Sequence, residues 1–176
     1  MTTYYEKVKF NGLSLFENKN VQVIVCPVNT IGVMGRGLAL EMAQRYPGVE
    51  EVYKRLCKEN KIGLGRPYLI SNPRPVLFFA TKQYWWRPSE IAYIKAGLSY
   101  WKKMVNGKGS GLWTQFISYG WPRLGCGLGG LNWTNVKPIM VDYLKDAKPY
   151  SYIHEPNMDG GSQLWTIETN TQMVKR

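Results

Sequence analysis

A short apolar run that leads directly into a glycine-broken turn and a helix-like segment constrains the fold of this 176-residue chain most strongly. Residues 21–26 are almost all apolar, as expected of a strand buried on both faces of a sheet. The turn covers residues 29–37, and residues 38–46 then have apolar side chains at helical spacing before Pro47. Strand, glycine turn and helix in this order are typical of an α/β fold.

The same alternation continues along the chain and predicts a single domain. Further strands are expected at residues 67–70, 76–81, 112–118 and 150–154, and helices at residues 49–56, 89–104 (with Ser89 as the N-cap) and 133–144. Together these elements predict a mixed sheet with helices on both faces. We assign residues 1–154 to this domain and residues 155–176 to a polar C-terminal extension.

Cysteine and histidine usage argues against a metal or disulfide framework. Cys26, Cys57 and Cys126 have no short mutual spacing, and His154 is the only histidine. No apolar run approaches the ~20 residues that cross a bilayer, and the N-terminus lacks the pattern of a signal peptide. We therefore expect a cytoplasmic protein with no metal, no cofactor and no membrane partner.

Positive charge is concentrated in the middle of the chain. The formal net charge is +11, and the only acidic residue between residues 60 and 141 is Glu90. Such a distribution favours a polyanionic partner such as nucleic acid, although it is also compatible with a solvated surface that keeps the protein soluble.

Two glycine-rich turns have the composition of phosphate-binding loops. They are Gly32-Val-Met-Gly-Arg-Gly37 and Gly125-Cys-Gly-Leu-Gly-Gly130, and each lies beyond a predicted strand. Open α/β sheets bind ligands at the carboxyl ends of their strands, where glycine lets backbone N–H groups approach a phosphate. Neither turn is a P-loop, because no Gly-Lys-Ser/Thr closes it, and either could serve only to reverse the chain.

Lys82 is the strongest catalytic candidate in the sequence. It follows an apolar strand and is surrounded by aromatic residues. Desolvation there would lower the pKa of its amine and expose the lone pair that a nucleophile or base requires. The alternative is an ordinary solvated lysine at a strand end.

Four motifs in sequence order resemble those of a macro domain. They occupy residues 27–41, 45–47, 81–89 and 122–133, within a similarity that extends from about residue 5 to residue 154. The resemblance is to the branch containing the DNA ADP-ribosyl glycohydrolases (DarG-like) and the terminal ADP-ribose protein glycohydrolases. It implies a three-layer α/β/α macro domain with a mixed central sheet and a cleft for ADP-ribose.

The resemblance also assigns roles to individual residues. Lys82 would be catalytic, together with Asn29, which would hold the distal ribose. Independently of the resemblance, Trp85, Trp86 and Arg87 stand next to the lysine and could contact an exposed base of single-stranded DNA, with core packing as the alternative for the two tryptophans. The ADP-ribose-binding residues would be Ser14, Leu15, Asn29, Gly32, Val33, Met34, Gly35, Leu124, Gly125, Cys126, Gly127, Leu128, Gly129, Gly130 and Leu131.

Two positions depart from the family pattern. The protein-directed branch has a catalytic aspartate where this chain has Gly129, which favours the DNA-directed branch. The family aspartate that reads the adenine amino group is replaced here by Ser14 or a close neighbour, which would alter adenine recognition.

The resemblance therefore implies an enzyme that removes ADP-ribose from DNA, in a toxin–antitoxin or phage-defence setting. Two alternatives use the same cleft: a non-catalytic ADP-ribose-binding module and an ADP-ribose 1″-phosphate phosphatase. The predicted partners are ADP-ribose or an ADP-ribosylated substrate, and single-stranded DNA.

Overall fold

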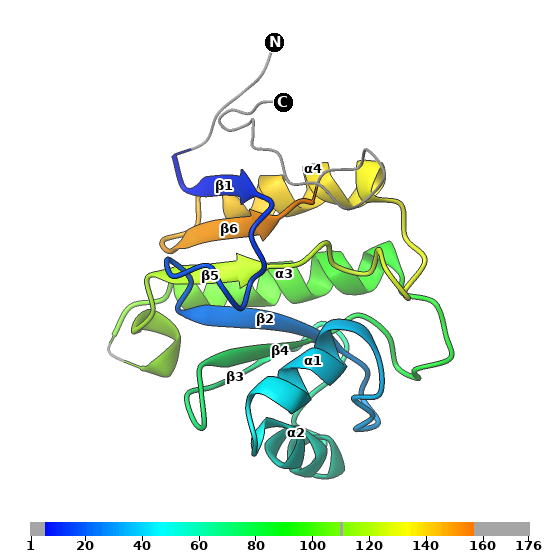
Figure 1. Ribbon diagram of the computed structural model, residues 1–176. Coiled ribbons are helices and arrows are strands. Elements are labelled where there is room, and N and C mark those ends of the chain that lie inside the picture. Colours follow the sequence, from blue (N-terminus) through cyan, green and yellow to red (C-terminus); the bar gives the residue numbers. More distant parts are fainter. Residues whose placement is uncertain (1–5, 110, 157–176) are drawn as a thin grey trace.

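Six strands form one mixed sheet in the order β1-β6-β5-β2-β4-β3 in the computed structural model, which describes residues 6–109 and 111–156 (Figure 1). The strands are β1 (Val8–Asn11), β2 (Val23–Val28), β3 (Tyr68–Ile70), β4 (Val76–Ala80), β5 (Ser118–Trp121) and β6 (Tyr150–His154). The helices are α1 (Gly37–Arg45), α2 (Val49–Lys58), α3 (Ile91–Val105) and α4 (Trp133–Leu144), with one 3₁₀ turn, η1 (Leu112–Thr114). Every neighbouring pair of strands is parallel except β3 and β4.

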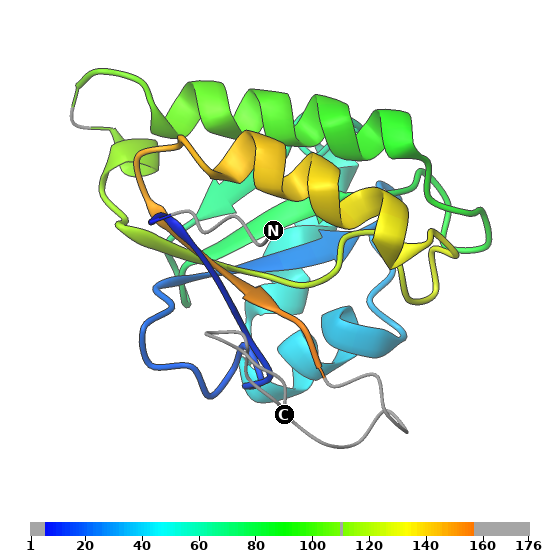
Figure 2. The ribbon, with the colours of Figure 1, turned by 90° about the horizontal axis from the view of Figure 1, so that it is seen from above.

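Helices cover both faces of this sheet, which confirms the three-layer α/β/α prediction. Along β2, Val23 and Val25 pack with the α3 and α4 side chains, whereas Ile24 and Cys26 pack with those of α1 and α2. This alternation is the period of a strand, and both cores are apolar because the central strands are buried on both sides. Figure 2 shows the two helix pairs on opposite sides of the sheet.

The parallel arrangement determines where a ligand site can form. Strands β1, β2, β4, β5 and β6 run in the same direction, so their carboxyl ends meet at one edge of the sheet. The segments that follow these ends include both glycine turns and Lys82. Residues far apart in sequence are thereby brought to a common edge.

Two sequence-based predictions about the elements are wrong. Residues 112–117 do not form a strand: they begin with η1, in which the Thr114 hydroxyl bonds to the carbonyls of Gly109 and Gly111, and β5 starts only at Ser118. Ser89 is not the N-cap of α3, because Glu90 occupies that position without a side-chain capping bond. Ser89 instead donates its backbone N–H to Gly129.

The start of the predicted C-terminal extension is bound to the domain. The Glu155 carboxylate accepts hydrogen bonds from Trp133 and Lys137 of α4, both at 2.8 Å. Residues 157–176 of that extension lie outside the described residues. None of the helices in the described part of the chain is long and apolar enough to cross a membrane.

Gly97 provides a test of the packing between α3 and the sheet. A Cβ atom there would lie 2.3 Å from Cζ of Phe79, whose ring is held edge-on against Trp121. We expect Gly97→Ala to lower the free energy of unfolding by about 2 kcal/mol, since overlap with three atoms of the buried ring puts the overpacking cost near the top of its range of about 1–3 kcal/mol and alanine regains about 1 kcal/mol of helix propensity. Ser99→Ala on the exposed face of the same helix should stay within about 0.5 kcal/mol of the wild type. Equal denaturant midpoints for Gly97→Ala and the wild type would contradict the packing.

Candidate active site

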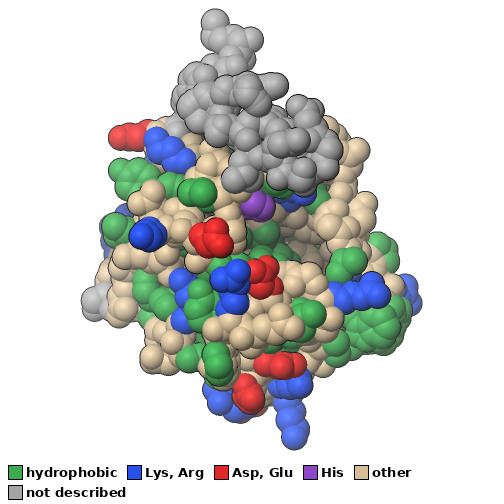
Figure 3. All heavy atoms as spheres, in the orientation of Figure 1, with side chains coloured by type: hydrophobic (Ala, Val, Ile, Leu, Met, Phe, Trp, Pro, Cys, Tyr) green, Lys and Arg blue, Asp and Glu red, His purple; other side chains and the backbone are tan. Residues whose placement is uncertain are grey.

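A cleft of about 1180 Å³ opens at the carboxyl edge of the sheet, between the two glycine turns. Most of the described residues that line it follow the ends of β1, β2, β4 and β5, and the others belong to the last residues of β2 and β6 and to the first half of α1. Figure 3 shows the hollowed face of the molecule, with charged and hydrophobic side chains around it. The cavity slightly exceeds the usual range for small-molecule sites, so it has room for an extended ligand.

The first glycine turn is shaped by Asn29, which is buried directly after β2. Its Oδ1 accepts the N–H groups of Ile31 and Val33 and the Tyr53 hydroxyl, and its Nδ2 donates to the Val33 carbonyl at 2.9 Å. A second bond from Tyr53 to the Asn29 carbonyl ties the turn to α2. The turn is therefore held from beneath by buried groups.

Only part of the predicted contact set in this turn faces the cleft. Val33 and Gly35 line it. Met34 is buried in the core shared with α1 and α2. Gly32 has a φ of +86° and packs over Lys54 and Cys57 of α2. The turn thus presents alternate residues to a ligand and to the core.

The second glycine turn has a similar division. Gly125, Gly127, Leu128 and Gly129 line the cleft. Of the other residues predicted in this turn, Leu124 is fully buried, Cys126 and Leu131 pack against the core, and Gly130 closes the turn through a bond to the Gly127 carbonyl.

Gly129 occupies a position where no side chain fits. A Cβ atom there would lie 2.3 Å from the Ser89 hydroxyl oxygen and 2.5 Å from the Gly125 carbonyl. The Ser89 hydroxyl has no hydrogen-bond partner among the described residues and lies buried against this glycine. The glycine in place of an aspartate is therefore required by the close approach of the turn to the start of α3.

Lys82 lies in the cleft, two residues after the end of β4. Its Nζ donates to the Leu128 carbonyl at 3.4 Å, so the amine reaches across to the second glycine turn. Partial burial lowers the pKa of Lys82 below the ordinary lysine value, because desolvation disfavours the charged amine. Lys82 is thus partly buried in the cleft rather than fully solvated.

The tryptophans beside the lysine lie on the surface, which excludes core packing for them. Trp85 and Trp86 are 56% and 57% exposed and both line the cleft. Trp86 stacks on Tyr84, with ring centroids 4.9 Å apart. Arg87 is exposed on the same loop but does not line the cleft. In Figure 3 exposed hydrophobic side chains project at the right-hand edge, where Figure 1 shows the loop between β4 and α3.

The opposite end of the cleft is formed by the segments at the ends of β1 and β6. Ser14 and Leu15 line this end, and the Ser14 hydroxyl accepts the N–H of Phe16 at 3.2 Å. His154, the last residue of β6, also lines this end, and its Nδ1 lies 2.7 Å from the Leu13 carbonyl. Burial lowers the pKa of His154, while the bond to Leu13 acts in the opposite direction. The neutral ring therefore donates from Nδ1 and leaves Nε2 as an acceptor.

Sequence reasoning missed His154 as a cleft residue. It is the last residue of β6, so the edge rule applied to this strand would have indicated it. Arg123, two residues after the end of β5, also lines the cleft. Tyr119 and Trp121, which precede the second turn, are fully buried in the core. No group of three or more metal-ligating side chains occurs within the described ranges, residues 6–109 and 111–156.

The chain is similar to curated bacterial proteins. It is 29% identical over 154 residues to the DNA ADP-ribosyl glycohydrolase of Mycobacterium tuberculosis, covering 85% of this chain and 42% of the relative. It is 34% identical over 156 residues to a DNA ADP-ribosyl transferase-DNA ADP-ribosyl glycohydrolase fusion protein of Thermosipho africanus, covering 75% of this chain and 39% of the relative. The chain thus spans about two fifths of the length of these relatives. No protein-family model matches it.

Solved structures show the same fold in these relatives. The macrodomain of Mycobacterium tuberculosis DarG superposes with a TM-score of 0.75 at 28% identity, over 85% of this chain and 98% of that one. The structure of Thermosipho africanus DarTG in complex with ADP-ribose gives a TM-score of 0.77 at 30% identity, over 84% of this chain and 41% of that one. Fold, cleft and sequence agree, and the chain is a macro domain close to that of DarG.

Proposed function

We propose that this macro domain binds ADP-ribose in the cleft and hydrolyses the bond that joins it to a base of DNA. The observation that carries the proposal is the position of Lys82, whose amine reaches the second glycine turn inside the cleft and has a lowered pKa. The names of the curated relatives, DNA ADP-ribosyl glycohydrolases, support the same chemistry.

Each part of ADP-ribose is proposed to occupy a different part of the cleft. The diphosphate would lie between the two glycine turns, against the backbone of Val33 and Gly35 on one side and of residues 127–129 on the other. The distal ribose would then lie over Lys82, and the adenosine would extend to the opposite end, at Ser14 and His154. Asn29 would act by shaping the first turn and by offering its remaining amide N–H to a ribose hydroxyl.

The reaction needs only the amine and water. The Lys82 lone pair attacks C1″ of the distal ribose while the bond from C1″ to the base breaks. The electron pair of the broken bond passes to the base, which takes up a proton. Water then attacks C1″, the bond to Nζ breaks, and ADP-ribose and a proton are released. The glycine turns hold the diphosphate still, so that C1″ remains above the amine.

Three substrates separate this function from its alternatives. The chain would be incubated with an ADP-ribosylated single-stranded oligonucleotide, an ADP-ribosylated protein and ADP-ribose 1″-phosphate, and the products would be quantified. We expect ADP-ribose to be released from the oligonucleotide fastest. Binding of ADP-ribose with no turnover would instead identify a binding module, and consumption of the phosphate alone would identify a phosphatase.

The DNA substrate is proposed to be single-stranded. Trp85 and Trp86 present exposed rings beside Lys82, and base stacking on such rings does not depend on sequence. Double-stranded DNA keeps its bases stacked inside the helix, where neither ring nor amine reaches them. A cytoplasmic location and a link to a DNA-modifying toxin remain predictions of the same proposal.

The pH dependence of release tests the state of the lysine. Attack requires the neutral amine, so the rate of ADP-ribose release should rise with pH through the pKa of Lys82. Because burial lowers that pKa, the midpoint should fall below the ordinary lysine value. A single-turnover pH–rate profile checks this. A rate that falls as the pH is raised from neutral, or a midpoint at the ordinary lysine value, would contradict a desolvated nucleophile.

A further inference from the structure

A second cavity, of about 480 Å³, lies at the β3 edge of the sheet, between β3, α3 and η1. Its volume falls within the range of small-ligand sites. It shares no lining residue with the ADP-ribose cleft among the described residues, so a group bound there would leave the cleft free. Its described lining residues are Asn60, Lys61, Arg66, Pro67, Tyr68, Leu69, Tyr100, Leu112 and Trp113.

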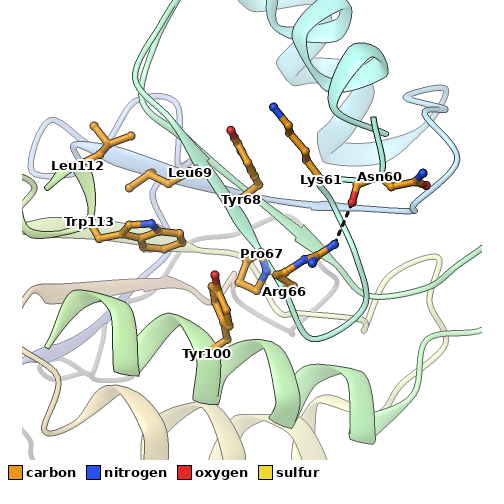
Figure 4. Close-up of a pocket in the computed structure, with 9 residues that line it drawn as sticks. All are labelled: Asn60, Lys61, Arg66, Pro67, Tyr68, Leu69, Tyr100, Leu112 and Trp113. Carbon is orange, nitrogen blue, oxygen red and sulfur yellow. Dashed lines mark hydrogen bonds between the residues drawn. The ribbon is translucent and has the colours of Figure 1, made fainter. Parts of the chain in front are cut away.

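The cavity combines flat apolar surfaces with positive charge. Tyr100 and Trp113 meet edge to face, with centroids 6.1 Å apart, and Figure 4 shows both side chains directed toward Pro67. None of the nine described lining residues is acidic, whereas Lys61 and Arg66 are cationic. These groups suit a planar aromatic ring that carries a negative charge.

Arg66 is positioned to receive an anion. Its Nη2 donates to the Asn60 carbonyl at 2.9 Å, drawn as a dashed line in Figure 4, and this bond fixes the guanidinium beside Pro67. One bond uses only one of its five N–H donors, and the side chain is exposed. Lys61 pairs with Glu59 at 3.3 Å, but both side chains are about half exposed, so this pair is weak and does not neutralise the site.

The cavity lies within reach of a strand that occupies the cleft. Helix α3 begins directly after the loop of Trp85 and Trp86 and carries Tyr100 nine residues beyond its first residue, a rise of about 14 Å. Gly65, next to Arg66, packs on Ala96 of the same helix. A few nucleotides could therefore follow α3 from the tryptophans to the cavity.

We propose that this cavity binds a nucleotide of the single-stranded DNA substrate at a distance from the ADP-ribosylated one, with the base on Trp113 and Tyr100 and the phosphate on Arg66 and Lys61. The proposal rests on the proposed DNA-directed function. A nucleotide held here would raise the affinity for long strands and would explain why the basic segment between residues 60 and 141 extends beyond the cleft.

The test compares Arg66→Glu with Lys9→Glu. Lys9 is exposed on β1, at the opposite edge of the sheet, and gives the same change of charge. Binding of an unmodified oligonucleotide of about 16 nucleotides, the upper site size of such grooves, would be measured over a range of salt concentrations, alongside a trinucleotide and free ADP-ribose. This binding assay requires no turnover, so it separates failure of this site from failure of the proposed glycohydrolase activity.

We expect Arg66→Glu to weaken binding of the long strand about tenfold and to reduce the slope of log K against log salt by about 0.7, the loss of one phosphate contact. ADP-ribose affinity should be unchanged, and Lys9→Glu should weaken the long strand less than about threefold. Trp113→Ala, with its melting temperature checked because the ring is half-buried, should weaken the long strand about fivefold or more.

Two results would overturn the proposal. One is equal loss of strand affinity in Arg66→Glu and Lys9→Glu, which would reflect net charge alone. The other concerns the tryptophan fluorescence that is lost in Trp113→Ala. If a free nucleoside monophosphate quenches this part of the fluorescence as strongly as the long strand does at the same concentration, the cavity is a site for free nucleotides.

Discussion

Replacing Lys82 with alanine should lower the rate of ADP-ribose release from DNA by about 10³-fold or more, while ADP-ribose binding changes only a few-fold. The amine is the only described group in the cleft that combines a nucleophilic nitrogen with a lowered pKa and contact with the second glycine turn. The diphosphate would be held by backbone groups that the substitution leaves in place. Single-turnover release and calorimetric titration with ADP-ribose measure the two effects separately.

Two control variants make this result specific. Lys82→Arg retains the positive charge but has no free lone pair at neutral pH, so it should be as inactive as the alanine variant. Lys58→Ala removes an exposed lysine at the end of α2 and should retain wild-type release. Substantial activity in Lys82→Arg would mean that the residue acts through its charge, and substantial activity in Lys82→Ala would remove it from the mechanism.

Any side chain at position 129 should disrupt the second glycine turn. In Gly129→Ala the new Cβ would meet the Ser89 hydroxyl and the Gly125 carbonyl, so the turn must move away from α3. We expect a loss of stability of about 1–3 kcal/mol and a loss of ADP-ribose affinity of tenfold or more, since the displaced backbone would line the diphosphate. Thermal unfolding and calorimetric titration check the two effects.

Gly127→Ala is the matched control for stability. Gly127 lies in the same turn, but its Cβ would meet nothing within 4 Å, and its φ is not in the left-handed region. Its melting temperature should therefore match the wild type. Gly129→Asp should likewise lose affinity without gaining activity on ADP-ribosylated protein, because the carboxylate has no room in this turn. Wild-type stability and affinity in Gly129→Ala would show that the turn adapts.

The helices and strands could be predicted wherever the apolar periodicity of the sequence matches the burial of the side chains. The bounds of α4 and β6 match the sequence prediction, because both have clear periodicity and clear ends. Strand β1 was not predicted, since its four residues contain only one fully buried side chain. β5 was misplaced because Gly120 weakens the strand pattern, yet this glycine is required where Val21 approaches within 2.8 Å of its Cβ position.

The sequence predicted which turns form the site, but it did not predict which residues of each turn face the cleft. Strand order and the glycine motifs bring Asn29, Lys82 and the second turn to one cleft, as expected. The division of each turn between cleft and core depends on long-range packing, such as that of Met34 and Leu124, which periodicity does not reveal. His154 could have been placed at the cleft from its position at the end of β6, but its bond to Leu13, 141 positions away in sequence, could not have been predicted.

The Tyr53 hydroxyl links the ligand affinity of the cleft to a helix outside it. It reaches Asn29 from α2, a helix that contributes no lining residue to the cleft within the described part of the chain. The first turn is thereby preorganised before any nucleotide arrives, and association does not bear the entropic cost of ordering it. Affinity for ADP-ribose is thus coupled to the integrity of a remote helix, and damage to α2 would register as weaker binding even with every contact residue intact.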